Sequence, residues 1–187
     1  TLNASTSSGL VQTADTSGTV EIQSNGTTKL TVSSSGVNIG QMNGGAITAG
    51  TAVSASSTSV DFTSIPSWVK RITVMFSGVS TSGTSLPMIQ LGDSGGVETT
   101  GYTAGSSLIG FGTSNYTTGF TIRTDAVAST IMDGFITINL VSSSTNSWVA
   151  GGNIYAPTPT AYMSAVSGAK SLSATLDRVR ITTVNGT

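Results

Sequence analysis

The chain has 187 residues, of which only 8% are charged, and its formal net charge is −1. Since about a quarter of the residues of a typical globular protein are charged, Ser, Thr, Gly and Asn must keep this surface hydrated instead, and the 37% hydrophobic content argues against disorder. Seven basic residues are too few for electrostatic binding of nucleic acid, and the lack of cysteine and histidine excludes disulfides, thiol catalysis and the usual zinc sites.

No apolar run is long enough to span a bilayer, and residues 1–20 lack the basic start and apolar core of a signal peptide. We therefore expect no membrane insertion, no metal and no cofactor. The composition is typical of an extracellular or virion-type β protein. Because the sequence does not begin with methionine, we expect a processed chain or a portion of a longer one.

Residues 1–50 predict a meander of very short strands. Asn25-Gly26 is a strong hairpin signal, and Ser35-Gly36 marks a second turn. Between these turns apolar and polar residues alternate, and the apolar positions are Val20, Ile22, Leu30, Val32, Val37 and Ile39. They are too few to close a core within one chain, so we expect two further copies to cover them, wound about a common axis. A flexible Ser/Gly/Thr linker is the alternative.

The glycine-rich piece 41–51 predicts a joint, and residues 51–187 predict a separate head domain built from longer strands. No helical period is present in the head, and clusters of Gly, Ser, Asn and Pro separate its apolar runs. This pattern favours an antiparallel β-sandwich or jelly roll. The expected strands are 58–63, 68–77, 86–92, 106–111, 117–123, 131–141, 146–156, 160–166 and 176–184.

Alternation within two of these strands predicts which side chains face the core. Ile72, Val74 and Phe76 form the inward set of 68–77, and Ile136, Ile138 and Leu140 form that of 131–141. Trp68 opens a strongly apolar strand, so we expect its ring in the core. The last strand precedes Asn185-Gly186-Thr187, a hairpin signal with no strand after it, which predicts either an open sheet edge or a natural chain that continues.

The pentapeptide Gly92-Asp93-Ser94-Gly95-Gly96 matches the surroundings of the nucleophile in chymotrypsin-like proteases. Such a serine needs a neighbouring base, which in that family is histidine, and this chain has none. Asp and Ser side chains also bond their own backbone, and Gly adopts positive φ readily. We therefore interpret the motif as a turn.

Two segments carry a resemblance to a known family. The first, 11-VQTADTSGTVEIQSNGTTKLTVSSSGVNI-39, resembles the repeated shaft units of phage and prophage tail fibres. The second, 65-IPSWVKRITVMFSGVSTSGTS-85 together with 176-LDRVRITTVNGT-187, resembles a C-terminal domain of tail proteins. The resemblance implies a homotrimeric virion protein whose head contacts the host surface and whose stalk contacts other tail proteins. It implies no catalytic residues.

Heads that bind receptors usually stack aromatic rings on sugar faces and add hydrogen bonds from Asp, Asn or Arg. The expected surface candidates are Trp148, Tyr155, Tyr116, Tyr102 and Asp93. For Trp148 a place in the core and an exposed platform are both open. For each tyrosine the alternative is a ring packed on the sandwich with its hydroxyl in water.

The carboxylates and the last arginines leave further alternatives open. A glycosidase needs two facing carboxylates, and only Asp93 with Glu98 and Asp125 with Asp133 lie close in sequence. Asp93 and Glu98 are also conceivable calcium ligands, although the EF-hand spacing is missing. Two roles are open for Arg178 and Arg180 on the final strand. They could protect an exposed sheet edge by their charge, or they could form an ion pair across the trimer interface.

From the sequence we expect an all-β, non-enzymatic virion protein. Its stalk would be a short-stranded trimeric fibre, and its β-sandwich or jelly-roll-like head would attach the tail to a surface glycan or protein of the host cell. The first alternative is a capsid decoration or head-fibre protein, for which trimers and sandwiches are equally suitable. The second is a depolymerase that cleaves polysaccharide.

Overall fold

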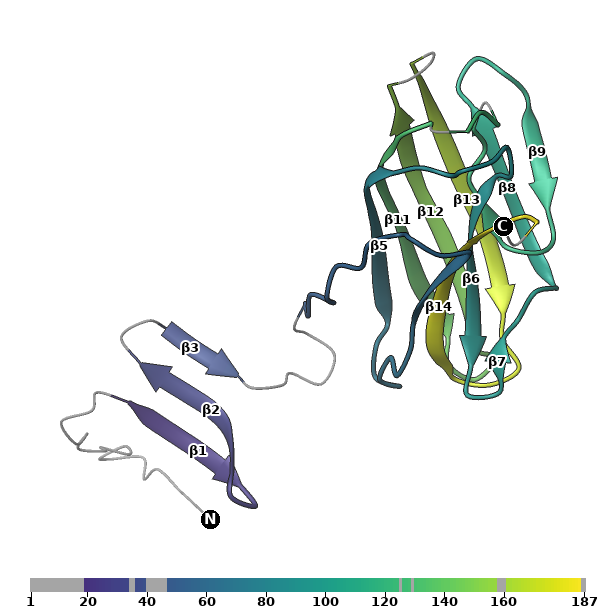
Figure 1. Cartoon of the computed structure of the whole chain (residues 1–187). Coiled ribbons are helices and arrows are strands. Elements are labelled where there is room, and N and C mark those ends of the chain that lie inside the picture. Colours follow the sequence, from purple (N-terminus) through teal and green to yellow (C-terminus); the bar gives the residue numbers. More distant parts are fainter. Residues whose placement is uncertain are drawn as a thin grey trace. The chain divides into compact units, whose positions relative to one another are not determined.

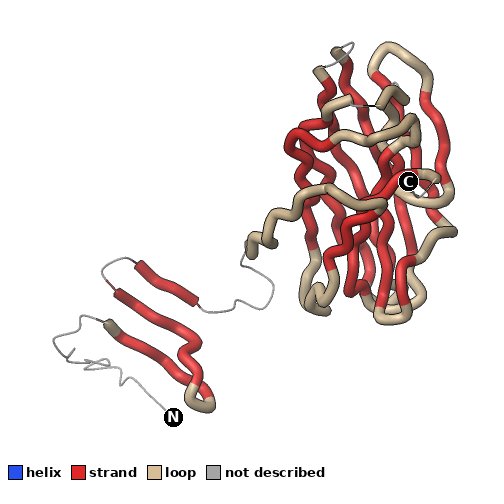
Figure 2. Tube along the Cα trace, in the orientation of Figure 1, coloured by secondary structure: helices blue, strands red, loops and turns tan. Residues whose placement is uncertain are grey.

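The computed structural model describes residues 19–33, 36–39, 47–124, 126–128, 130–157 and 161–185. All regular structure in these ranges is β-strand, in antiparallel sheets, which confirms the all-β prediction (Figure 2). None of the described residues forms a helix long and apolar enough to cross a membrane. The chain divides into two compact units, residues 1–49 and 50–187.

The first unit contains a three-stranded meander of β1 (Val20–Ser24), β2 (Thr27–Ser33) and β3 (Gly36–Ile39). Asn25 and Gly26 join β1 to β2 with φ angles of 52° and 72°. Positive φ at both central residues is the signature of a type I′ hairpin turn, whose twist matches that of the flanking strands. The predicted hairpin is therefore confirmed, while Ser35 of the predicted Ser35-Gly36 turn lies outside the described residues.

The second unit is a sandwich of two antiparallel sheets (Figure 1). One sheet has five strands in the order β10-β6-β14-β4, with β7 paired to β6. Its strands are β4 (Ser59–Phe62), β6 (Pro87–Asp93), β7 (Gly96–Val97), β10 (Phe120–Thr121) and β14 (Leu176–Thr183).

The other sheet has six strands in the order β5-β11-β12-β13-β8-β9. Its strands are β5 (Arg71–Val79), β8 (Tyr102–Leu108), β9 (Thr113–Tyr116), β11 (Met132–Ser142), β12 (Ser147–Ala156) and β13 (Tyr162–Ser171). The two sheets are joined repeatedly by connections that cross from one to the other, as Figure 1 shows.

Alternating side chains from both sheets meet in one hydrophobic core. On β5 the core side chains are Val74 and Phe76, with Ile72 packed against them, and on β11 Ile136 and Ile138 are fully buried. Leu140 packs against the same core. Both predicted inward sets are thus confirmed, because burial of every second residue is what a strand with one covered face requires.

The strand prediction was wrong for four strands of the head. β8 begins at Tyr102 rather than at residue 106, and β7 and β9 were not expected at all. β13 runs to Ser171, well past the expected end at residue 166. In β8 the inward positions between Tyr102 and Leu108 are Ala104 and Ser106, which carry too little apolar surface to produce a visible alternation.

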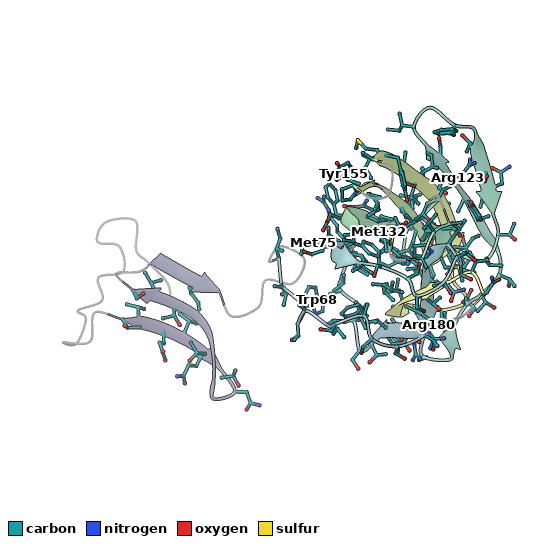
Figure 3. All side chains as sticks on the ribbon, turned by 45° about the horizontal axis from the view of Figure 1, so that its top comes forward. Trp68, Met75, Arg123, Met132, Tyr155 and Arg180 are labelled. Carbon is teal, nitrogen blue, oxygen red and sulfur yellow. The ribbon has the colours of Figure 1, made fainter. Side chains whose placement is uncertain are left out.

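Trp68 differs from the expectation, whereas for Trp148 the structure decides between the two alternatives. Trp68 lies in a turn before β5 and is half-buried, so the prediction that it opens a strand in the core is wrong. Trp148 is only 3% exposed and belongs to the core, packed between the sheets. Figure 3 labels Trp68.

β14 is not an edge strand, because it pairs with β6 on one side and with β4 on the other. Of the alternatives left open by the sequence, an open edge at the last strand and protection of that edge by Arg178 and Arg180 are therefore wrong. Arg180 donates two hydrogen bonds of 2.7 Å to the Asp61 carboxylate on β4, and Arg178 pairs with its neighbour Asp177. Both arginines have partners within their own chain.

Candidate functional site

Five exposed apolar side chains lie next to one another on the outer face of the six-stranded sheet. We call this set the outer patch; its members are Met75, Ile109, Phe135, Tyr155 and Met163. Met75 is 78% exposed, and the other four are between 44% and 60% exposed. Figure 3 labels Met75 and Tyr155, which lie near each other on this side of the sandwich.

Strand register brings these five residues together. Met75 of β5 is opposite Phe135 of β11, and Tyr155 of β12 is opposite Met163 of β13. Ile109 follows β8 and donates its backbone N–H to the Met163 carbonyl at 2.9 Å. Directly opposed residues point to the same face of a sheet, so all five residues lie on one face, where Phe135 and Tyr155 are diagonal neighbours on adjacent strands.

The outer patch departs from the usual alternation of an antiparallel sandwich, in which the outer face is polar. Each patch residue is followed or preceded by a buried one, such as Val74 beside Met75 and Ile136 beside Phe135. Both faces of the sheet are therefore apolar at this end. Exposed apolar patches of this kind mark interaction sites more often than scattered single residues do.

Two polar side chains lie beside the outer patch and affect which ligands it can bind. Asn153 is opposite Phe135, and Asp133 is opposite Tyr155. One carboxylate oxygen of Asp133 accepts a 2.7 Å hydrogen bond from the Gly78 N–H, so that side chain is held in place. Flat rings, flexible thioethers and an amide suit a sugar face or an apolar protein surface.

The structure disperses the surface candidates taken from the sequence. Tyr155 lies in the outer patch, whereas Tyr116, half-buried on β9, and Tyr102 line a separate groove of about 410 Å³ together with Asn115 and Gly105. Trp148, Tyr102 and Asp93 are 3%, 2% and 5% exposed. The prediction that these three lie on the binding surface is wrong, because each is packed or hydrogen-bonded inside the sandwich.

Tyr102 and Asp93 belong to a polar cluster near the turns that follow β6 and β13. Lys170 is buried, forms an ion pair with Glu98, and places its ammonium 5.3 Å from the centre of the Tyr102 ring. The Tyr102 hydroxyl accepts a 2.7 Å hydrogen bond from the Leu91 N–H and donates to the Glu98 carbonyl at 3.0 Å. Burial raises the pKa of Tyr102, so its hydroxyl stays protonated.

Ser173 joins the two neighbouring carboxylates of this cluster. Its hydroxyl donates to Asp93 at 2.6 Å, and its backbone N–H donates to Glu98 at 2.7 Å. Asp93 also accepts from the Gly95 N–H at 2.7 Å and so closes the two-residue turn between β6 and β7. The interpretation of the Asp-Ser-Gly-Gly motif as a turn is confirmed.

These contacts make the cluster a structural element. The hydrogen bond from Ser173 lowers the pKa of Asp93; burial opposes ionisation of Glu98, but its bond to Lys170 and the Ser173 contacts leave that pKa lowered as well. A general acid of a glycosidase needs a raised pKa, which neither carboxyl has. Asp125 lies outside the described residues. No group of three potential metal ligands occurs among the residues described.

The lowered pKa values predict acid sensitivity. Carboxyls whose pKa is lower in the folded state stabilise the fold at pH values above the unfolded pKa, about 4. That stabilisation is lost as the pH falls through the folded values. We expect the thermal midpoint of the wild type to fall below about pH 4.5. For Glu98→Gln we expect a smaller fall, which thermal unfolding followed by circular dichroism between pH 3 and 7 would measure; equal slopes would contradict the assignment.

Four members of the outer patch were missed by sequence reasoning, which weighed only aromatic residues near loops. The available signal was in 131-IMDGFITINLV-141, where Phe135 adds an apolar residue of the opposite parity to the inward set. Met75, Ile109 and Met163 are likewise apolar residues at positions next to an inward-facing residue. Only the strand register shows that they adjoin.

No family model, curated protein or solved structure matches the chain. The fold and the surfaces described above therefore carry the functional argument.

Proposed function

We propose that the chain is a trimeric virion fibre protein, most closely a phage tail fibre, which attaches to a cell surface through its sandwich. The observation that carries this proposal is the apolar face of the β1-β2-β3 sheet. In the described residues nothing covers Ile22 and Val32, which are 55% and 39% exposed.

That face is continuous across all three strands. The register places Ile22 opposite Leu30 and Leu30 opposite Ile39, and it places Val20 opposite Val32 and Val32 opposite Val37. Val20 and Leu30 are half-buried, and only the backbone positions of Val37 and Ile39 are described. A three-stranded sheet of this size is marginal alone, so further copies would supply the missing cover.

Threefold symmetry rests on the resemblance to tail fibres. Three such sheets around one axis bury three apolar faces in a closed assembly, which leaves no open surface for further growth. The sandwich fits the same proposal. If β7 and the β12-β13 hairpin are left out, one sheet has the strand order β4-β14-β6-β10 and the other has the order β5-β11-β8-β9. These orders support a jelly roll into which one hairpin is inserted.

Attachment through the outer patch would gain strength from three copies. Once one sandwich binds, the linked copies experience a high effective concentration of receptor, and avidity can exceed single-site affinity by about 10²–10⁴-fold. A weak, neutral contact through Phe135 and Tyr155 is then sufficient for lasting adhesion.

The attachment function predicts a specific effect of patch substitutions. We expect Phe135→Ser combined with Tyr155→Ser to reduce binding of the fluorescently labelled chain to bacterial cells at least tenfold, with little change in thermal stability, because both side chains are exposed. The measurement is flow cytometry across a panel of bacterial strains, with a strain that binds the wild type as the reference.

Val141→Ser is the matched control. Val141 is 63% exposed on the same strand as Phe135 but near its other end. We expect this variant to bind like the wild type. Equal loss in both variants would show a general effect of surface polarity, and retention of binding by the double variant would remove the outer patch as the attachment site.

A further inference from the structure

Four side chains on the outer face of the six-stranded sheet form a square across β11 and β12. Asp133 and Phe135 come from β11, and they are opposite Tyr155 and Asn153 of β12. Opposed residues share a face, so the two aromatic rings occupy one diagonal of the square and the two polar groups occupy the other. We call these four residues the quartet. Within it, apolar and hydrogen-bonding groups alternate.

Two glycines fix the backbone under the quartet. Gly134 lies between Asp133 and Phe135 with a φ of 143°, and a Cβ at this position would collide with the Asn153 carbonyl oxygen. A Cβ at Gly152 would collide with the Phe135 carbonyl oxygen. Neither position can therefore carry a side chain in this backbone, which holds β11 and β12 close together below the quartet.

Both polar side chains of the quartet keep hydrogen-bonding capacity for a ligand. One carboxylate oxygen of Asp133 accepts from the Gly78 N–H at 2.7 Å, which fixes the orientation of the group. The second oxygen has no hydrogen bond or ion pair among the described residues. The exposed side-chain amide of Asn153 has no partner among them either. The quartet thus offers a fixed acceptor and a free amide beside two rings.

These features favour an uncharged sugar ring over an apolar protein surface. A pyranose has an apolar C–H face that stacks on an aromatic ring, and hydroxyls around its edge that need hydrogen-bond partners. Neighbouring positions of the quartet are about 5 Å apart across the strands and about 7 Å apart along a strand, so one such ring can contact all four.

The Asp133 carboxylate decides against two other occupants. An apolar protein surface packed on the quartet would bury this charge without a partner for its second oxygen, which is costly. An acidic sugar would bring a like charge to it and be repelled. The hydroxyls of an uncharged sugar supply the missing donors.

We propose that the quartet binds one uncharged pyranose unit of a surface glycan. Tyr155 stacks on the apolar face of the sugar, and Phe135 contacts its edge. The free oxygen of Asp133 accepts a hydrogen bond from one hydroxyl, and the Asn153 amide bonds another. That the sugar belongs to a cell surface rests on the proposed attachment function, whereas binding of the pyranose itself does not.

The test uses the methionine methyl signals of the ¹³C-labelled intact chain, because Met75 is opposite Phe135 and Met163 is opposite Tyr155. Met75→Leu and Met163→Leu identify the two signals. The probes are the methyl α-pyranosides of glucose, galactose and mannose. At least one of these should shift both signals saturably, while the signal of the buried Met88 stays in place. Glycerol at equal concentration should shift none of them.

Asp133→Asn should weaken binding of that pyranoside about tenfold, because a neutral acceptor replaces a charged one. The asparagine oxygen can still accept from the Gly78 N–H, so the thermal midpoint should stay the same. Asp177→Asn is the matched control, since it removes a carboxylate from the other sheet and should leave the affinity unchanged.

Two results would overturn the sugar site. One is the absence of a saturable shift of the Met75 and Met163 signals with all three pyranosides. The other is equal affinity of Asp133→Asn and the wild type. Because no cell enters these measurements, a failure of cell attachment would contradict only the proposed function. Conversely, loss of cell binding in the Phe135→Ser, Tyr155→Ser variant without any pyranoside binding would keep the attachment site and remove the sugar.

Discussion

Replacing Glu98 with glutamine is expected to lower the free energy of unfolding of the sandwich by about 3 kcal/mol, or its thermal midpoint by about 10 °C. The variant leaves the Lys170 ammonium buried without its counter-charge, since the side chain of Lys170 is only 5% exposed. Removing one partner of a buried pair costs more than the pair itself contributes, because the remaining charge stays desolvated.

Two further variants separate this cause from others. Glu98→Gln combined with Lys170→Met removes both charges and should recover at least half of the lost stability. Asp177→Asn breaks the more exposed pair with Arg178 and should cost less than about 1 kcal/mol. Thermal unfolding of all three variants at pH 7 gives the comparison. If Glu98→Gln proved as mild as Asp177→Asn, the buried pair would not stabilise the fold.

Leu30→Lys is expected to dissociate the assembled chain into single chains. In the proposed trimer each Leu30 faces the common axis, and a lysine there would bury three like charges together. The penalty is about 3 kcal/mol or more for each chain. Because Leu30 is only half-buried within its own chain, the sandwich should keep its circular dichroism spectrum and its thermal midpoint.

Thr31→Lys is the matched control, since residue 31 points to the opposite face of β2 from Leu30. Its register partner on β1 is Glu21, so the new charge gains a favourable neighbour. We expect this variant to keep the mass of the wild type in sedimentation. A Leu30→Lys chain that also kept that mass would show that the apolar face is not the assembly surface.

The sequence was informative wherever one face of a strand carries large aliphatic residues. Ile72, Val74 and Phe76 occupy every second position of β5, and the structure places all three against the core. The Asn25-Gly26 turn was equally accessible, because few residue pairs adopt positive φ twice in succession.

Where small residues face the core, the sequence signal failed. Ala104 and Ser106 fill the inward positions of β8, and the strand was misplaced by four residues at its start. Long-range partners were equally invisible. Arg180 and Asp61 are 119 positions apart, and only the pairing of β14 with β4 brings them together.

The candidate binding surface was predictable only in part. Tyr155 was named for its aromatic ring near a loop, but its neighbours in the outer patch come from β5, β11, β13 and the turn after β8. Their proximity depends on register across the whole sheet, which no local pattern specifies. For Trp148 the sequence left the core and an exposed platform both open, and the structure places its ring in the core, on a strand position opposite Leu140.

The mass of the intact chain in solution tests the central claim most directly. Sedimentation equilibrium of the purified wild type, over a hundredfold range of dilution and without cross-linker, should give three times the 18.7 kDa of a single chain. A mass of 18.7 kDa at every concentration would contradict the proposal that the apolar face of the β1-β2-β3 sheet assembles the protein into a fibre.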